Sequence, residues 1–520
     1  MKRLTDYATF SDAMEHFSSK CLWDLMDGDA VHLNIAHEAV DRHVGTNRVA
    51  IRVAHADGSD EVITFDELSR LSSRIANWLI AEGIEKGDRV GIMLDPSLAF
   101  YGCLFGAIKA GAIAVPLFTL FGIDAIKARV EDCGAKILIV CEEKIEAAQQ
   151  IDDLTVIVGN EGFLRAVEAY SDTIATESHP RDLAIFQYTS GTSTGVPTAV
   201  RHNHLSIVYL MAAALYGTGI RPGDNFFCPS SPAWGHGLWH GTIAPLVLGV
   251  TTGTISGKFD AEILAKALQE YRINALSAAP THFRLLNRLE NKDNFQFQVT
   301  KISYTGEPLD STTHDFIVAK FGIKPCSMYG TTEVGAVLVN FPGASDYEPL
   351  KGALGKPMPG MSLQIQSPDG RVCDAREVGD IAVRRSGNWV LTKDLGFCDD
   401  NGYFYYQGRA DDVIISAGWT MNAIEIEDTL LKHQLVNEAA VIGVPDELRG
   451  LIPKAFIVLE NPKDAHKANI VEDLQKFVKT YLSLHEFPRE IEFVPSLPKT
   501  PAGKVDRKNL RDREVVGGVT

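Results

Sequence analysis

The most constraining feature of this sequence is a regular alternation of short apolar runs and helical patterns before about residue 350. Residues 90–94 and 136–140 have the composition of buried strands. Thr64 and Glu67 form a capping-box pattern just before apolar residues at helical spacing, and residues 261–271 repeat such a helical pattern. This alternation predicts layers of helix and sheet, with a largely parallel sheet.

The pattern changes near residue 350, where short strand-like runs and turn signals replace the alternation. Residues 368–370 (PDG) and 401–402 (NG) are typical of tight turns between antiparallel strands. After residue 409 helical and strand-like runs mix again, and residues 511–520 are expected to fray. The chain, with 520 residues, is longer than a single core usually supports. The sequence therefore predicts an α/β fold with a large N-terminal region of layered α/β subdomains, a β-rich subdomain and a small α+β C-terminal domain.

Charge and cysteine content exclude several classes of function. The chain has 67 Asp+Glu against 50 Lys+Arg residues, a formal net charge of −17, which argues against a nucleic-acid or anionic-membrane binder. Its eight cysteines include no C-x-x-C pair, so neither a disulfide framework nor a zinc site is expected, and reduced thiols favour a cytoplasmic protein. The first residues lack the apolar core of a secretory signal.

The most apolar stretch, residues 100–122, has the length of a membrane span. Lys109 and Pro116 interrupt it, and its Gly and Ala residues suit close packing of a helix on a sheet. We therefore expect a buried helix followed by a strand, and no membrane span.

Residues 188–200, YTSGTSTGVPTAV, form a neutral loop rich in Gly, Ser and Thr. Small residues let consecutive backbone N–H groups converge on an anion such as a phosphate. The loop is not a Walker A element, because Gly191 and Gly195 are too close together and no lysine follows. Taken alone, it fits either a phosphate-binding loop or an ordinary turn.

Four further motifs follow this loop in order. They are residues 304–308 (YTGEP), 328–333 (MYGTTE), Asp394 with 408–412 (GRADD), and 498–504 (PKTPAGK). Together with the loop, and at this spacing, they resemble the core motifs of the adenylate-forming superfamily, which includes acyl-CoA synthetases, luciferases and the adenylation domains of peptide synthetases. The resemblance covers essentially the whole chain.

Within that superfamily the chain is most similar to acetate, medium-chain and aromatic or alicyclic acid CoA ligases. Trp234, in CPSSPAWGH, stands eleven residues before Pro245, as a tryptophan does in acetyl and medium-chain members. The resemblance implies that ATP adenylates a small carboxylic acid to acyl-AMP with release of pyrophosphate, aided by Mg²⁺, and that coenzyme A then accepts the acyl group. The adenylation transition state concentrates negative charge on phosphate oxygens, so catalysis rests on positioning and electrostatic stabilisation.

The resemblance also implies roles for individual residues. Lys504 would contact the carboxylate and α-phosphate oxygens, Glu333 would hold Mg²⁺, and Thr192 would act on the phosphates. Asp394 would bind both ribose hydroxyls, and the ring of Tyr329 would stack on the adenine. The residues expected to bind ATP or AMP are Thr189, Ser190, Gly191, Thr192, Ser193, Gly306, Glu307, Pro308, Tyr329, Gly330, Thr331, Thr332, Asp394 and Arg409.

Acid and thiol sites follow from the same resemblance. The acyl pocket would be lined by Trp234, His236, Trp239 and Thr305. Ala and Gly residues nearby suggest room for more than acetate, so a medium-chain, aromatic or alicyclic acid is favoured, and no charged residue there indicates a second carboxylate or an amine on the substrate. A large domain, 1–408, and a mobile small domain, 411–520, would rotate about a hinge at 409–411 that contains Asp411. That rotation would remove Lys504 from the site and bring Gly418 and Trp419 beside the pantetheine arm of CoA.

Three positions depart from the usual family pattern. The phosphate loop is one residue longer than usual and has Thr198 in place of a lysine, for which Arg201 is a candidate substitute. Lys393 stands where the family has a glycine, and Thr420 where an arginine is common. These departures leave adenylation as the expected reaction but predict an altered rate.

Competing interpretations remain open at this point. A carrier protein could replace CoA as the acceptor, and a non-catalytic nucleotide-binding relative could keep the fold without the chemistry. An amino-acid substrate is disfavoured, because no carboxylate near Trp234 would pair with an ammonium. The histidines at 202, 204, 236 and 240 lack further ligands at metal-binding spacing, so no transition-metal site is expected. A homodimer is compatible with the resemblance.

Overall fold

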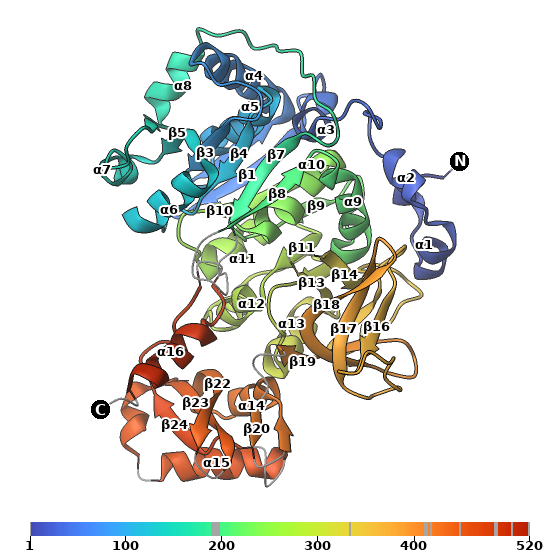
Figure 1. The fold of residues 1–520 in the computed structure, drawn as a ribbon, viewed down its shortest axis with the longest axis vertical. Helices are drawn as coiled ribbons and strands as arrows, with labels where there is room; N and C mark the ends of the chain where they lie inside the picture. The colour runs from blue at the N-terminus through green and yellow to red at the C-terminus, as the bar shows by residue number, and fades with distance from the viewer. Residues whose placement is uncertain are drawn as a thin grey trace.

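The structure is a computed structural model. It describes residues 2–188, 198–331, 334–409, 414–416, 419–446, 449–467, 469–482, 487–500 and 503–517. Figure 1 shows a large layered body formed by the first two thirds of the chain, a β-rich unit beside it, and a small C-terminal unit below. This arrangement confirms the α/β fold expected from the sequence.

A six-stranded sheet lies in the first part of the large body. Its order is β6-β5-β3-β4-β7-β8, and all neighbours are parallel except β7 and β8. The strands are β3 (Arg89–Met93), β4 (Ile113–Pro116), β5 (Ala135–Val140), β6 (Thr155–Val158), β7 (Leu183–Tyr188) and β8 (Ala199–Asn203). The accompanying helices are α4 (Phe65–Ala81), α5 (Leu98–Lys109), α6 (Ile123–Cys133), η3 (Glu142–Lys144), α7 (Ile145–Ala148) and α8 (Glu161–Val167).

A second sheet continues from the large body into the β-rich unit, in the order β16-β17-β18-β19-β15-β14-β13-β12-β11-β9-β10-β1-β2. The run from β1 to β13 is parallel, whereas β13 to β16 pair antiparallel. The parallel part contains β1 (Val49–His55), β9 (Asn225–Phe227), β10 (Thr251–Ser256), β11 (Ala275–Ala278), β12 (Lys301–Tyr304) and β13 (Cys326–Thr331); β2 (Asp60–Thr64) is an antiparallel edge. The remaining strands are β14 (Gly335–Val339), β15 (Ala353–Pro357), β16 (Leu363–Gln366), β17 (Gly379–Arg385), β18 (Asn388–Cys398) and β19 (Phe404–Arg409).

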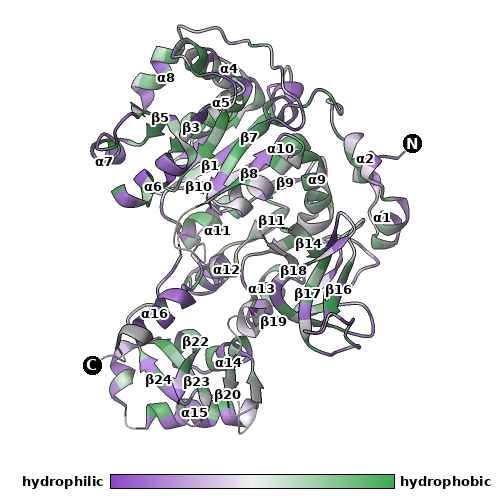
Figure 2. Cartoon of the chain, in the orientation of Figure 1, coloured by the Kyte–Doolittle hydropathy of each residue, from purple (hydrophilic) through white to green (hydrophobic). Residues whose placement is uncertain are grey.

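Helices cover this second sheet and the N-terminal segment of the chain. Along the sheet lie α9 (Ser206–Ala213), η4 (Ala214–Thr218), η5 (His236–Ile243), α10 (Ala244–Val247), α11 (Ala261–Glu270), α12 (Pro280–Asn287), η6 (Lys292–Asn294) and α13 (Ser311–Phe321). The N-terminal segment contains η1 (Leu4–Asp6), α1 (Phe10–His16), α2 (Ser19–Trp23), α3 (Ile35–Ala39) and η2 (Asp41–His43). In Figure 2 the strands of both sheets are mostly hydrophobic, and the outer helices α7 and α8 carry more hydrophilic residues.

The C-terminal unit has a smaller sheet, β21-β20-β23-β22, with β24 added in parallel beside β23. Its elements are β20 (Ile414–Ser416), β21 (Trp419–Met421), α14 (Ala423–Leu431), β22 (Val436–Asp446), β23 (Gly450–Leu459), η7 (Pro462–His466), α15 (Ile470–Tyr481), β24 (Glu490–Phe493) and α16 (Arg507–Gly517). The domain limits 1–408 and 411–520, with a hinge at 409–411, remain predictions.

The expected fraying of residues 511–520 is wrong for most of that segment, because α16 extends to Gly517. Leu510 is fully buried against a small cluster that includes Phe456 and Leu497. The ammonium of Lys454 lies 2.8 Å from Glu514. A single buried leucine in a charged segment gives almost no hydrophobic periodicity, so the sequence pattern did not indicate this helix.

Residues 100–122 form a buried helix and strand, as predicted. Helix α5 is buried over nearly its whole length, and Lys109 donates to Asp41 at 2.6 Å. Its glycines pack on helix α4 instead of on the sheet, since a Cβ added at Gly102 would lie 2.7 Å from Leu71. Throughout the described part of the chain, no helix has both the length and the apolar character needed to cross a bilayer.

Candidate active site

The site lies where β12 and β13 end. These strands are parallel, so their carboxyl ends meet at one edge of the sheet, the edge at which α/β proteins usually bind ligands. Gly306 follows β12 with φ +102°, a conformation that L side chains rarely adopt. A Cβ at this position would lie 3.0 Å from the ring of Trp234 and 3.4 Å from Cε of Lys504. Three distant parts of the sequence therefore meet at Gly306.

Lys504 reaches this point on a tight turn of the C-terminal unit. Thr500 donates its N–H to the carbonyl of Lys504 at 2.7 Å, and its hydroxyl accepts from the Lys504 N–H at 3.3 Å. The Lys504 ammonium lies 5.6 Å from the centre of the Trp234 ring. Burial lowers the pKa of Lys504, while the carboxylates of Glu307 and Asp394 act in the opposite direction. The structure thus places a half-buried cation between the large body and the C-terminal unit.

Asp394 is buried at a bulge in β18. Leu391 and Leu395 lie four residues apart on β18, but their partners on β17 lie only two residues apart. The extra residues of β18 between them therefore bulge out of the strand pairing. The hydroxyl of Tyr329 donates to Asp394 Oδ2 at 2.6 Å, and Arg409 donates to Oδ1 at 3.2 Å. Burial, together with the Asp394 charge, raises the pKa of Tyr329 far above its usual value. Tyr329 therefore stays protonated and acts as a donor.

Lys393 lies in this bulge and has φ +64°. The left-handed conformation costs a non-glycine residue about 1–2 kcal/mol. The wild-type lysine already bears that cost, so we expect Lys393→Val to lower the free energy of unfolding only by the additional strain of a β-branched residue, about 1 kcal/mol. Lys393→Gly should be at least as stable as the wild type. Urea unfolding checks both variants, and a valine variant with wild-type stability would contradict the assigned backbone strain.

The Glu307 side chain turns away from the strand end and holds the 306–308 turn to helix α12. Its Oε1 accepts from the Thr281 hydroxyl at 2.7 Å and from Arg284 at 3.2 Å. Arg284 also donates to Asp310 at 2.8 Å. The sequence motif singled out Glu307 but gave no sign of Arg284 or Asp310, because their pairing depends on the packing of α12 and α13 beside the turn.

The residues expected to line the acyl pocket are buried or half-buried. Trp234 and His236 have rings 5.4 Å apart in an edge-to-face arrangement. His236 is buried and hydrogen-bonds to Ser230 at 3.0 Å and to Ser277 at 2.8 Å, and burial lowers its pKa well below the ordinary value. Trp239, also buried, donates to Gln187 at 3.0 Å. Thr305 is half-buried between β12 and Gly306. The Ser277 and Ser230 partners were not expected from the sequence.

Two buried polar atoms near the strand ends have no hydrogen-bond partner among the described residues. They are the hydroxyl of Thr331, at the end of β13, and the amide nitrogen of Gln187, near the end of β7. Unsatisfied buried polar atoms are costly, and where they occur they often mark a missing ligand. They flank the two segments expected to bind phosphate and magnesium.

Several expected site residues lie outside the described residues. They are Thr189, Ser190, Gly191, Thr192, Ser193, Thr332, Glu333, Asp411 and Gly418. Trp419 lies in β21, but its side chain is likewise outside the description. Pro308 and Gly330 lie on the turn after β12 and on β13. The guanidinium of Arg201, the candidate substitute for the loop lysine, lies over the Phe186 ring, 5.1 Å from its centre.

Buried and half-buried histidines predict an acid-sensitive fold. Burial lowers the pKa of His202, His204, His240 and His282 to about 4 from an ordinary value of 6.5. The unfolded chain therefore binds more protons than the folded chain as the pH falls through that window. We expect the urea midpoint to decrease between pH 6.5 and 4, and a constant midpoint over this range would contradict the assignment.

The described residues hold no group of three or more His, Cys, Asp or Glu side chains suited to a metal ion.

Comparison with known proteins identifies the class. The model of the AMP-binding enzyme family matches residues 38–391, and that of the AMP-binding enzyme C-terminal domain matches residues 425–504. The sequence is 33% identical over 516 residues to the uncharacterised acyl–CoA ligase YtcI of Bacillus subtilis, covering 93% of this chain and 96% of that protein. It is 33% identical over 529 residues to acetyl-coenzyme A synthetase of the same organism, covering 93% and 91%.

A solved structure gives the same result. The crystal structure of Brucella canis acyl-CoA synthetase matches with a TM-score of 0.75 and 31% identity, over 98% of this chain and 99% of that one. The chain therefore belongs to the AMP-binding enzyme family, which confirms the resemblance drawn from its motifs. More particularly, it is an acid–thiol ligase of the AMP-forming, acyl-CoA synthetase type.

Proposed function

We propose that this chain adenylates a medium-chain, aromatic or alicyclic carboxylic acid with ATP and then transfers the acyl group to CoA. The observation that carries the proposal is the half-buried Lys504 side chain, which lies beside Trp234 and Gly306 and is acted on by the charges of Glu307 and Asp394. In adenylation a carboxylate oxygen attacks the α-phosphorus and pyrophosphate leaves. A fixed ammonium at that junction offsets the repulsion between two anions and stabilises the charge that develops.

Asp394 and Tyr329 would bind the nucleoside. The Asp394 carboxylate is held by Tyr329 and Arg409, and a carboxylate has the acceptor oxygens that a ribose diol requires. The ring of Tyr329 would stack on the adenine, with the 306–308 turn forming the other wall. Glu307 would act through the turn, since its carboxylate already binds Thr281 and Arg284.

The triphosphate would bind between the ends of β7 and β13. The unpaired hydroxyl of Thr331 and the unpaired amide of Gln187 provide hydrogen-bonding groups for phosphate oxygens there, and thus fit such a ligand. Glu333, with Thr192 in the phosphate loop, would hold Mg²⁺, which supplies positive charge to the phosphates when bound. The neutral phosphate loop would contribute backbone N–H groups and hydroxyls, and Lys504 and Arg409 would contribute the protein's own charge.

The substrate assignment rests on the walls around Trp234. This ring, with His236 and Thr305, would border the space beside Gly306. None of these three side chains carries a charge that could pair with a second charged group on the substrate. His236 is held neutral by burial, so it does not provide a cation for a second substrate carboxylate. An apolar acid larger than acetate fits such walls best.

Thioester formation would require the C-terminal unit to rotate about residues 409–411, since Lys504 occupies the site in the present arrangement. Rotation would withdraw Lys504 and bring Gly418 and Trp419 to the entrance, where the CoA thiol displaces AMP. A carrier protein is the alternative acceptor. A cytoplasmic location, favoured by eight cysteines that are all free, and a homodimer complete the proposal.

Pyrophosphate release with a panel of acids tests the substrate. We expect octanoate, benzoate or cyclohexanecarboxylate to give kcat/KM at least tenfold above that of acetate, since each added buried methylene contributes about 0.8 kcal/mol. Acetate as the best substrate would contradict the pocket assignment. Supplying CoA or a holo-carrier protein in the second step distinguishes the two acceptors.

A further inference from the structure

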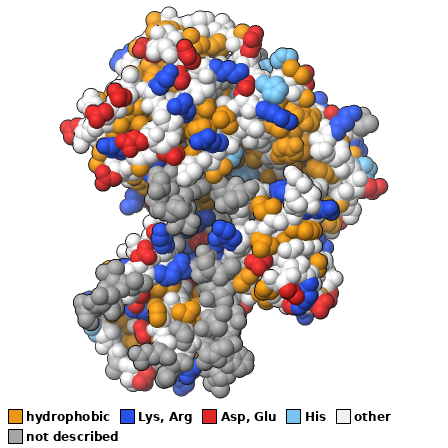
Figure 3. Space-filling model, in the orientation of Figure 1, with side chains coloured by type: hydrophobic (Ala, Val, Ile, Leu, Met, Phe, Trp, Pro, Cys, Tyr) orange, Lys and Arg blue, Asp and Glu red, His pale blue; other side chains and the backbone are white. Residues whose placement is uncertain are grey.

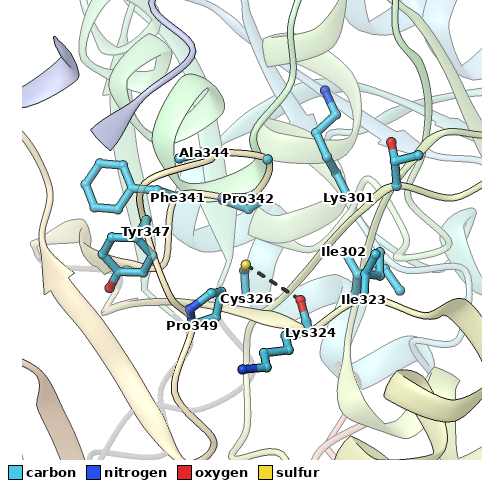
Figure 4. Close-up of a pocket in the computed structure, with 12 residues that line it drawn as sticks. Lys301, Ile302, Ile323, Lys324, Cys326, Phe341, Pro342, Ala344, Tyr347 and Pro349 are labelled. Carbon is cyan, nitrogen blue, oxygen red and sulfur yellow. Dashed lines mark hydrogen bonds between the residues drawn. The ribbon is translucent and has the colours of Figure 1, made fainter. Parts of the chain in front are cut away.

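A cavity of about 140 Å³ lies at the other ends of the strands that carry the site. It is bordered by Tyr7 of the N-terminal segment, Tyr216 of η4, Arg221 and Lys301. A neighbouring cavity of about 230 Å³ shares Lys301 and residues 341–344 with it; Figure 4 shows these shared residues around the larger cavity. Lys301 begins β12, whereas Gly306 follows its end, so the cavity is separate from the adenylation site.

Arg221 supplies a cation without a paired carboxylate. Its guanidinium donates to the carbonyls of Leu215 at 2.6 Å, Ile220 at 2.9 Å and Tyr7 at 3.3 Å. Among the described residues, no carboxylate oxygen lies within ion-pair distance of this guanidinium. Burial lowers the pKa of Arg221, while the charges of Tyr216 and Asp224 act in the opposite direction. A half-buried guanidinium that donates only to carbonyl oxygens gains less than one that also meets an anion.

The carboxylate of Asp224 does not neutralise both cations that border the cavity. It accepts from the Lys301 ammonium at 2.5 Å, from the Arg221 backbone N–H at 2.7 Å and from Asn274 at 2.8 Å. Asp224 is therefore already paired with Lys301. The residues that border the cavity include Arg221 and Lys301 and no Asp or Glu. The local charge is positive by about one unit.

Tyr216 provides a hydroxyl without a partner. Its side chain is only 1% exposed, and among the described residues its Oη has no hydrogen-bond partner. The Arg221 charge acts on this hydroxyl, which places the two groups near each other. Unpaired buried hydroxyls are rare because each loses its hydrogen bonds to water on folding. A cation and a free donor on the wall of one cavity are the two groups that a carboxylate requires.

We propose that this cavity binds a small organic carboxylate, whose oxygens accept hydrogen bonds from Arg221 and Tyr216 and whose apolar part packs on Phe341 and Pro342. A cavity of about 150 Å³ can hold a benzene-sized molecule, so the space suits an acid of about that size. The neighbouring cavity gives room for a longer tail. Such an acid would bind without competing with the acyl-adenylate.

Crystals soaked in graded concentrations of 4-bromobenzoate test this proposal, because the anomalous signal of bromine gives both position and occupancy. Tyr216→Phe is the informative variant, since it removes a hydroxyl that has no partner in the fold and should leave folding intact. Tyr209→Phe, on the exposed part of α9, is the matched control. 4-Bromobenzamide is the neutral counterpart of the probe.

We expect bromine in this cavity in the wild type and in Tyr209→Phe, with half-maximal occupancy requiring at least tenfold more 4-bromobenzoate in Tyr216→Phe. The amide should not bind there. Bromine found only beside Trp234 or nowhere, equal half-saturation in Tyr216→Phe, or equal binding of the amide would each overturn the proposal. None of these results bears on adenylation, because the two sites lie at opposite strand ends.

Discussion

Replacing Lys504 with alanine should reduce carboxylate-dependent ATP–pyrophosphate exchange by about 10²–10³-fold, the usual effect of removing one group that stabilises transition-state charge. The half-buried ammonium lies beside Trp234 and is acted on by the charges of two carboxylates, so its loss leaves negative charge unopposed at the reacting centre. Pre-formed acyl-AMP should still be converted to the thioester at close to the wild-type rate, because Lys504 would leave the site before that step. Measuring the two half-reactions separately checks both statements.

Lys499→Ala is the matched control. Lys499 lies in the same 498–504 motif, but its ammonium pairs with Glu438 of β22 within the C-terminal unit. We expect its exchange rate to stay within about twofold of the wild type, since an exposed ion pair contributes at most about 1 kcal/mol. Equal exchange by Lys504→Ala and the wild type would refute the role assigned to Lys504.

Replacing Arg284 with methionine should lower the free energy of unfolding by about 3–5 kcal/mol, the cost of breaking a buried ion pair from one side. Arg284 binds both Glu307 and Asp310, and these carboxylates are 17% and 8% exposed. Without the guanidinium two largely buried anions face each other unpaired. The 306–308 turn loses its support in the same variant, so the KM for ATP should rise. Urea unfolding and steady-state kinetics measure the two effects.

Arg371→Met provides the comparison for stability. Arg371 also forms a two-pronged pair with a glutamate, Glu377, but both side chains are substantially exposed. Such a pair contributes at most about 1 kcal/mol, so this variant should unfold close to the wild-type midpoint. Equal destabilisation by the two substitutions would show that the Arg284 network is no more than a surface pair.

Local patterns were sufficient to predict the layered fold. The capping box at Thr64 and Glu67 forms reciprocal hydrogen bonds at the start of α4, as its spacing predicts. The apolar runs form β3 and β5 because their residues are buried on both faces of a parallel sheet. These signals lie within a few residues of the elements that they specify.

The site could be predicted only in part, because its geometry depends on contacts between distant segments. Motif matches singled out Asp394, but not the bulge and the left-handed Lys393 that direct its side chain. They singled out Glu307, but not Arg284, which holds it. The meeting of Trp234 with Lys504 depends on the orientation of the C-terminal unit, and no local sequence pattern specifies that orientation.

Figure 3 shows lysine and arginine side chains gathered at the junction of the large body and the C-terminal unit. We propose that the chain uses ATP to adenylate an organic acid at this junction. Phosphorus NMR of purified protein with ATP, Mg²⁺ and a mixture of organic acids tests it most directly. We expect AMP and pyrophosphate as the products, and we expect them to form only when an organic acid is present. Formation of ADP and phosphate, or no acid-dependent cleavage of ATP, would contradict it.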